Sequence, residues 1–509
     1  MPTVTRNLLG NFVGRGIGAA LSILLVPVYI RFLGVEAYGL VGFFLILQSL
    51  TGFFDLGLST TTNREIALRV ADDQRRSEAR DVLRTVESIY WPIGIAVGSI
   101  VFLAAPWIAH RWLQSNTLGT GVVQTVIALM GLTLALQWPY TIYDSALHGL
   151  QRIVEYNTIA AGMQIVRGAG AVLVIWLWPT IIAFFIWQML VSCATVALLV
   201  NQTWRAMPEG PRPVIRLRLL TNVWRFAAGM LATVILYIIL GYADRIILSR
   251  VLTLESFGYY SVAGMVSTGL LYLMAPISQT VLPRFTELLA KGRHEDLMRT
   301  YHLSAQLMTA LLTPVALVLA LFSYEVLTIW TRSPLVAGHT AGLVPFLVIG
   351  TLLYALVDVP YMMQLAQGRT RLAVRTNLAA VLFYVPLLFV MVHRFGAIGA
   401  AIAVLCLKSV RFLIWGVVAH NDALRAEKWR WYIEDIARPA LAAAAVTIAA
   451  RLLLSREAFA SSVVGLLLIG AIITAAIAAA ALAAPLTRAR ARDLRPLLRQ
   501  RWAARRIDK

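Results

Sequence analysis

The chain has 509 residues, of which 59% are hydrophobic and only 14% are charged. Soluble domains are about 45–50% apolar and about 25% charged, so this composition excludes a soluble globular protein. Lysine and arginine outnumber aspartate and glutamate by 45 to 25. In so apolar a chain, this excess indicates which side of a membrane each loop faces rather than binding to nucleic acid.

Apolar segments of about 20 residues, the length that crosses a bilayer as a helix, recur along the whole chain. They are continuously apolar rather than alternating, which excludes a transmembrane β-barrel. We therefore predict an all-α polytopic membrane protein of about 14 transmembrane helices. Prolines inside these segments, such as Pro139 and Pro360, are candidates for kinks. The predicted spans are 7–32, 37–62, 86–109, 119–146, 156–178, 179–201, 222–249, 257–282, 304–330, 340–366, 374–394, 396–420, 436–454 and 459–484.

The basic residues are distributed unequally between the two sides of this predicted topology. Segments on the side of both termini hold 31 of the 45, the opposite side holds 6, and the spans hold the remaining 8. Cytoplasmic loops carry an excess of lysine and arginine, so both termini are predicted to be cytoplasmic.

Short loops exclude several functions. No predicted outside loop is longer than about 15 residues, whereas a membrane polymerase or ligase that acts at the outer face needs room there for catalytic groups. The G-x-x-x-x-G-K-[ST] motif of nucleotide-driven pumps is absent from the sequence. We therefore predict a transporter rather than an enzyme, with no cofactor, and with a proton or sodium gradient as the candidate energy source.

An internal repeat divides the chain. The segment from Arg31 to Gly39 recurs from Arg250 to Gly258, with Arg, Leu, Glu, an aromatic residue and Gly at identical spacing. The offset between the copies spans six predicted helices, an even number, so both copies have the same orientation. We predict two parallel six-helix bundles around a central cavity, followed by two C-terminal helices. The predicted parts are an N-terminal bundle at 1–201, a cytoplasmic linker at 202–221, a C-terminal bundle at 222–420, two additional transmembrane helices at 436–484 and a basic cytoplasmic tail at 488–509.

A motif near the N-terminus resembles the Wzx-type polysaccharide flippases of the multidrug/oligosaccharidyl-lipid/polysaccharide (MOP) exporter superfamily. The resemblance implies movement of an undecaprenyl-diphosphate-linked oligosaccharide between the leaflets of the membrane. Three alternatives stay open: the lipid II flippase branch, a cation-coupled drug antiporter of the same superfamily, and a non-transporting scaffold for polysaccharide synthesis. The residues that carry the resemblance are Arg31, Glu36, Tyr38, Gly39, Asp55, Gly57 and Arg64.

Four bases lie inside predicted spans: Arg15, Arg167, Lys408 and Arg411. Each would cost about 2.5–3.5 kcal/mol at the centre of a helix that faces lipid, so they are expected to face a cavity. Arginine binds phosphate oxygens through a bidentate fork and lysine through a compact charge. We therefore predict that these bases bind the diphosphate of the substrate. The alternative is that they neutralise buried acids or extend to the interface.

Acidic residues inside spans are candidates for ion coupling. Asp144 and Asp358 lie on polar faces of corresponding spans in the two repeats, and Asp244 lies on a polar stripe of the seventh span. Such acids can bind sodium or transfer protons. The alternative places Asp244 at the outer interface, and Asp55 and Asp144 at cytoplasmic helix ends.

The C-terminal tail 488–509 carries nine bases, which predicts contact with anionic lipids of the inner leaflet. Other predicted partners are the lipid-linked oligosaccharide itself and, in the same pathway, a polysaccharide polymerase and glycosyltransferases.

Overall fold

The computed structural model describes residues 18, 21–55, 57–216, 221–368, 370–418, 427–459 and 461–488. For 53–54, 221–234, 370–375 and 418 it describes the backbone alone. Helices make up nearly all of this part of the chain, and its one β-bridge joins Gln114 to Thr253. Eleven of the described helices are long and apolar enough to cross a membrane, and the shorter apolar segment Leu21–Leu33 adds to them. The all-α membrane class is therefore confirmed, while the count of 14 spans stays a prediction.

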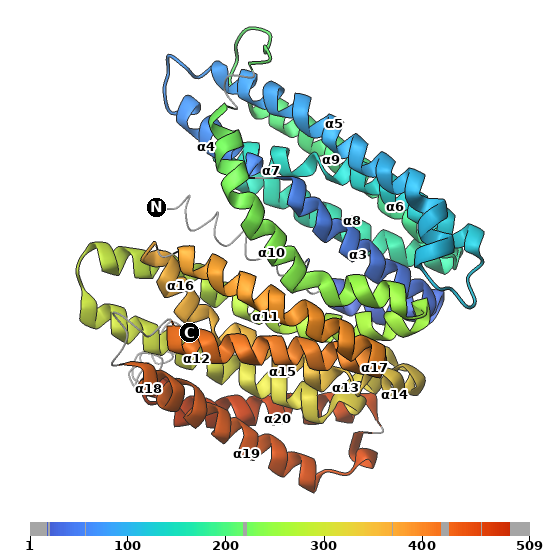
Figure 1. Ribbon diagram of the computed structural model, residues 1–509, viewed down its shortest axis with the longest axis vertical. Coiled ribbons are helices and arrows are strands. Elements are labelled where there is room, and N and C mark those ends of the chain that lie inside the picture. Colours follow the sequence, from blue (N-terminus) through green and yellow to red (C-terminus); the bar gives the residue numbers. More distant parts are fainter. Residues whose placement is uncertain are drawn as a thin grey trace, which may run out of the picture. The chain divides into compact units, whose positions relative to one another are not determined.

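The chain divides into two compact units, Met1–Ser261 and Val262–Lys509, which are described separately. The predicted boundaries at 201 and 222 stay predictions. The first unit contains the following helices (Figure 1): α2 (Val26–Leu33), α3 (Val35–Asp55), α4 (Leu58–Val70), α5 (Glu78–Trp107), the π-helix η1 (Ile108–Trp112), α6 (Thr120–Gln137), α7 (Tyr140–Gly149), α8 (Ile153–Leu177), α9 (Ile181–Ala206), α10 (Thr221–Val251) and the first residues of α11 (Leu254–Ala290).

The second unit contains the rest of α11 and the following helices: α12 (His294–Leu321), α13 (Ser323–Thr331), α14 (Pro334–Thr340), α15 (Val344–Leu356), α16 (Asp358–Ala366), α17 (Thr370–Val418), α18 (Lys428–Arg430), the π-helix η4 (Trp431–Ala437), α19 (Arg438–Leu453), the 3-10 helix η5 (Arg456–Phe459) and α20 (Ser462–Ala483). The C-terminal helices α19 and α20 pack against each other and against α12 (Figure 1).

Small residues bring helices together where lipid supplies no hydrophobic driving force. Helices α5 and α6 lie side by side in the first unit (Figure 1). A Cβ atom at Gly98 would lie 2.6 Å from the carbonyl oxygen of Gly131, and one at Gly131 would lie 2.7 Å from the carbonyl oxygen of Gly98. The two backbones can therefore touch only because both positions are glycine.

Chain breaks fall at proline and glycine. Helix α8 ends at Leu177 and α9 begins at Ile181, which confirms the break predicted at Trp178-Pro179. Helix α17 bends at Gly396, whose φ of 58° and ψ of −133° are accessible to glycine alone, between the predicted spans 374–394 and 396–420.

Two predicted spans are kinked between two helices. The span 119–146 kinks at Trp138 and Pro139, between α6 and α7, and the span 340–366 kinks at Val357, between α15 and α16. Trp138 and Val357 are separated by the same offset as Arg31 and Arg250 of the sequence repeat. The two repeats thus share a kinked helix as well as a sequence motif.

Candidate functional site

The antiparallel pair α8 and α9 positions the first candidate base, Arg167. Thr180 begins α9 as its N-cap: its Oγ1 accepts a hydrogen bond of 3.2 Å from the backbone N–H of Ala183. The Trp187 indole Nε1–H on α9 in turn donates to the backbone oxygen of Arg167 on α8, at 3.2 Å. These contacts set the register that places Arg167 opposite the polar face of α9.

The guanidinium of Arg167 binds neutral partners. Its Nη1 donates to Gln188 Oε1 at 3.0 Å, and its Nη2 donates to Ser192 Oγ at 3.3 Å. No acidic side chain forms an ion pair with Arg167 among the described residues. A guanidinium carries five N–H donors, so these two bonds leave donors for an anionic ligand. The interpretation that Arg167 neutralises a buried acid receives no support from these contacts.

Arg167 is the end of a chain of side-chain hydrogen bonds that crosses four helices. Gln48 on α3 donates to Gln137 on α6 at 2.7 Å, and Gln137 donates to Ser192 on α9 at 3.0 Å. Ser192 in turn accepts from Arg167 on α8. We call Gln48, Gln137, Gln188, Ser192 and Arg167 the Arg167 chain. It fixes the guanidinium with uncharged groups, an arrangement that leaves the positive charge uncompensated for a ligand.

The other described bases lie in the second unit, on α17. Lys408 Nζ lies 4.8 Å from the centre of the Tyr354 ring of α15, a cation–π contact. Arg411, one turn later, interacts electrostatically with Tyr354 and with Tyr361 of α16. No ion pair with an acid is present at Arg411 among the described residues. Tyrosine side chains of α15 and α16 thus lie near both bases.

Arg15 lies outside the described residues, as does the basic tail beyond Arg488. The cationic cavity predicted from all four bases therefore stays a prediction, because Arg167 belongs to one unit and Lys408 and Arg411 belong to the other.

Each acidic candidate lies beside a polar side chain. In the first unit, Asp144 Oδ1 lies 2.8 Å from His148 Nδ1, and Tyr260 OH donates to Asp244 Oδ2 at 2.6 Å. In the second unit, Ser278 Oγ on α11 donates to Asp358 on α16. Asp244 and Asp358 are both 7% exposed, whereas the Asp144 side chain is 33% exposed. Coupling roles for these acids stay predictions.

Several residues of the family motif have structural contacts. Glu36 is buried and accepts hydrogen bonds from the backbone N–H groups of Asn116 at 2.6 Å and Thr117 at 2.9 Å, and also from the Thr117 hydroxyl. Asp55 accepts from Ser59 at 2.7 Å and from Tyr90. Glu36 therefore holds the loop at Asn116 and Thr117, and Asp55 holds the end of α3. Of the remaining motif residues, Tyr38 is buried, whereas Arg31 and Arg64 are exposed. Gly57 has a left-handed φ of 78°.

The repeated glycines of the motif make a reciprocal contact. A Cβ atom at Gly39 on α3 would lie 2.3 Å from the carbonyl oxygen of Leu254, and one at Gly258 on α11 would lie 2.3 Å from that of Val35. Val35 and Leu254 are themselves equivalent positions of the two copies of the motif. Each copy thus places its glycine on the first turn of the helix that carries the other copy.

Sequence reasoning identified Arg167 but missed its partners Gln188 and Ser192, and it missed Gln48. The sequence indicated these partners only by their polar character within apolar spans. Helical periodicity shows which residues share a face, but it does not show which helices meet, so these partners could not be assigned.

Comparison with known proteins supports the family assignment. The family model for polysaccharide biosynthesis proteins matches residues 4–289, and the MatE model matches residues 230–390. The chain is 22% identical over 404 residues to a Shigella flexneri protein named as an O-antigen transporter, with 79% of this chain and 94% of the relative covered. It is 25% identical over 477 residues to the succinoglycan biosynthesis transport protein ExoT of Rhizobium meliloti (strain 1021), with 89% and 87% covered.

Solved structures share the fold. The lipid II flippase MurJ in an inward closed conformation has a TM-score of 0.64 at 13% identity and covers 92% of this chain and 98% of its own. An inward-facing multidrug resistance transporter of the MATE family has a TM-score of 0.63 at 14% identity, with 82% and 96% covered. This likeness confirms that the chain has the fold of these transporters. Since the family model covers more than half of its residues, the chain belongs to the polysaccharide biosynthesis protein family, a group of membrane flippases within the MOP superfamily.

Proposed function

We propose that this protein flips an undecaprenyl-diphosphate-linked oligosaccharide from the cytoplasmic to the periplasmic leaflet of the bacterial inner membrane, with both termini in the cytoplasm. Its relatives are named as transporters of O-antigen and succinoglycan, and its fold is similar to that of the lipid II flippase. The substrate class follows from these names together with the resemblance carried by the motif from Arg31 to Arg64.

The observation that carries the proposal is the uncompensated charge of Arg167. A diphosphate is the part of the substrate that is costly to move through a membrane, and a guanidinium binds phosphate oxygens strongly when no carboxylate competes. The Arg167 chain holds this group with two neutral hydrogen bonds, at 3.0 and 3.3 Å. Lys408 and Arg411 would supply the matching charges from the second unit, and Arg15 a fourth.

Alternating access supplies the mechanism that we propose. Halves of a parallel repeat rock about a fixed site and expose it to each side in turn. A coupling ion would drive net transport only if it binds the two states differently. Asp144 and Asp358 are our candidate sites for this ion, because they occupy corresponding kinked helices of the repeats, Asp144 beside His148 and Asp358 beside Ser278.

The test is export of the surface glycan by a strain that carries single variants at equal protein abundance. Loss of a buried phosphate contact costs about 2 kcal/mol or more, which lowers the rate roughly 30-fold. We therefore expect Arg167→Ala to lose most export and Arg167→Lys to retain part of it, because lysine keeps the charge and loses the fork. Lys408→Ala and Arg15→Ala are expected to act in the same direction.

The matched control is Arg152→Ala. Arg152 precedes the same helix, is 55% exposed and pairs with Glu155 at 2.6 Å, so its loss should leave export unchanged. Normal export by the Arg167, Lys408 and Arg15 variants at normal abundance would overturn the cationic-site proposal.

A second candidate is a cation-coupled drug antiporter, which is favoured by the MatE match over residues 230–390 and by the MATE fold. An antiporter of cationic drugs needs acids in its cavity, whereas Arg167 and Arg411 have no acidic partner in the part of the chain that the structure describes. Deletion of the gene should abolish glycan export and leave drug sensitivity unchanged. The reverse result would favour the antiporter.

A further inference from the structure

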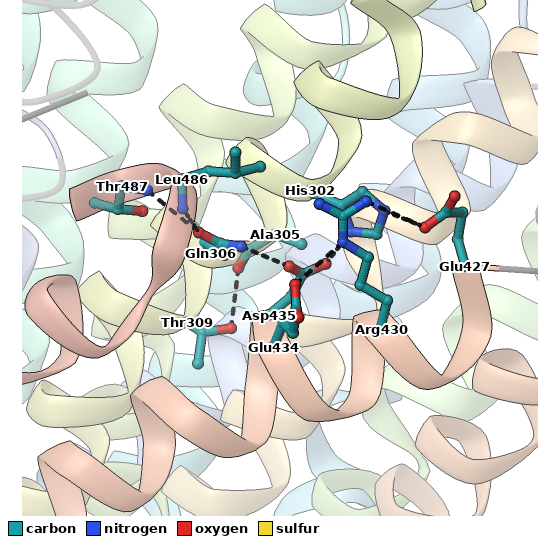
Figure 2. A network of polar contacts seen from close by, with 10 residues as sticks. All are labelled: His302, Ala305, Gln306, Thr309, Glu427, Arg430, Glu434, Asp435, Leu486 and Thr487. Carbon is teal, nitrogen blue, oxygen red and sulfur yellow. Dashed lines mark hydrogen bonds and ion pairs between the residues drawn. The ribbon is translucent and has the colours of Figure 1, made fainter. Parts of the chain in front are cut away.

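A polar network joins α12 to the C-terminal helices in the second unit (Figure 2). His302 and Gln306 lie one turn apart on α12 and face the same side. Asp435 of η4 reaches both: Oδ2 lies 2.5 Å from His302 Nδ1, and Oδ1 accepts from Gln306 Nε2 at 2.8 Å. Gln306 Oε1 accepts from the backbone N–H groups of Leu486 at 2.9 Å and Thr487 at 3.3 Å, beyond the end of α20. The network therefore holds both ends of the α19–α20 pair on α12.

The centre of this network is buried. His302 and Asp435 are both 0% exposed, and the second ring nitrogen of the histidine, Nε2, lies 2.9 Å from Glu427 Oε2. The Glu427 side chain is 25% exposed, so it connects the cluster to solvent. Because a buried polar group without a partner is costly, each of these contacts needs a hydrogen atom between nitrogen and oxygen.

The two contacts of His302 require one hydrogen atom more than a neutral imidazole and two ionised carboxylates provide. Two ionised carboxylates accept only, and a neutral imidazole has one N–H and one bare nitrogen. His302 therefore satisfies Asp435 or Glu427, but not both. The observed pair of contacts needs one further proton, carried on the imidazole or on either carboxylate.

No neighbouring group among the described residues substitutes for that proton. Arg430 Nη1 lies 3.6 Å from Glu427 and its Nε lies 3.1 Å from Glu434, and its charge also acts on Asp435. Arg438 lies 3.7 Å from Glu434. The rings of Tyr301 and Tyr432 pack nearby, and Tyr301 interacts electrostatically with both carboxylates. Among the described residues that follow α20, Leu486 and Thr487 donate their backbone N–H groups to Gln306.

We propose that His302, Asp435 and Glu427 form a proton-binding site, and that the bound proton fastens the α19–α20 pair to α12. Loss of the proton would leave a bare nitrogen of the buried His302 ring against a carboxylate, a contact without a hydrogen atom. Docking of the C-terminal pair would then weaken as pH rises, by about tenfold in its equilibrium constant per pH unit, the slope of one linked proton. This inference is independent of the substrate proposed above.

Asp435→Asn keeps the contacts of the network but removes the need for the additional proton. The amide that this substitution introduces can donate to His302 Nδ1 and still accept from Gln306, while Nε2–H donates to Glu427. Every contact is then satisfied with a neutral imidazole, so the variant should dock at all pH values. His302→Ala, which leaves the carboxylates without a bridge, should dock poorly throughout. His393→Gln alters an exposed histidine of α17 and serves as the control.

The measurement is the distance between spin labels at Leu307 on α12 and Leu482 on α20, both exposed, in the full chain in detergent with Cys193 and Cys406 replaced by alanine. Between about pH 6 and about pH 9, where a histidine site can change its charge, we expect the wild-type and control distances to lengthen or broaden, and those of Asp435→Asn to stay short. A wild-type distance that does not change with pH would overturn the proposal. So would an Asp435→Asn response equal to the wild-type response.

Discussion

The most informative test of the fold concerns Glu36 and its repeat counterpart, Glu255. Glu36 accepts hydrogen bonds from two backbone N–H groups and one hydroxyl in the loop at Asn116 and Thr117, whereas Glu255 accepts a hydrogen bond of 3.1 Å from Tyr259 on its own helix. Gln at position 36 keeps one acceptor oxygen and replaces the other with a donor. We therefore predict that Glu36→Gln loosens this loop and that Glu255→Gln does not.

The magnitude follows from the lost bond. A hydrogen bond to a charged group contributes about 1.5–3 kcal/mol, so local opening of the loop should become roughly 10- to 150-fold more frequent. Hydrogen–deuterium exchange of peptides that cover 113–119 measures this opening directly. Equal exchange in wild type and Glu36→Gln, or equal acceleration in the Glu36 and Glu255 variants, would refute the reasoning.

Three further outcomes are expected. Gly39→Val should prevent accumulation of folded protein, because its Cβ would lie 2.3 Å from a carbonyl oxygen, whereas Gly52→Ala meets nothing within 4 Å and should accumulate normally by fluorescence size-exclusion chromatography. Glu325 is 4% exposed and Arg451, which it contacts at 3.0 Å, is 30% exposed. Glu325→Gln removes the carboxylate charge and should cost about 1.5–3 kcal/mol in a thermal unfolding assay in detergent. Gly396→Ala should cost about 1–3 kcal/mol in the same assay, since it forces a side chain into a glycine conformation. An unchanged unfolding temperature for either of the last two variants would contradict the corresponding estimate.

The membrane class and the repeat could be predicted from the sequence because both are properties of linear pattern. Apolar length marks a span wherever it occurs, and a constant offset between two copies of a motif survives even where few residues match. The helix break at Trp178-Pro179 was predictable for a similar reason, since proline lacks the N–H that continues a helix. Pro139, a predicted kink candidate, lies at the kink between α6 and α7.

The site partners could not be predicted because they depend on which helices meet. Arg167 and Ser192 lie on adjacent helices, yet many polar residues lie at comparable distances along the chain. His302 and Asp435 are 133 residues apart, and no sequence motif links the two positions. The sequence also equated Glu36 with Glu255, whereas only the first holds the loop at Thr117, so a shared motif does not ensure a shared role.

The reciprocal contact of Gly39 and Gly258 bears on the origin of the chain. In an isologous homodimer, residue i of one subunit contacts residue j of the other, and residue j of the first subunit contacts residue i of the second. Gly39 against Leu254 and Gly258 against Val35 have this form, at equivalent positions of the two repeats. A contact of this form is what two copies of the motif would make if they once belonged to two identical subunits. In such an ancestor every substitution at the contact appeared twice, and fusion made it possible for one copy of the motif to change while the other was kept.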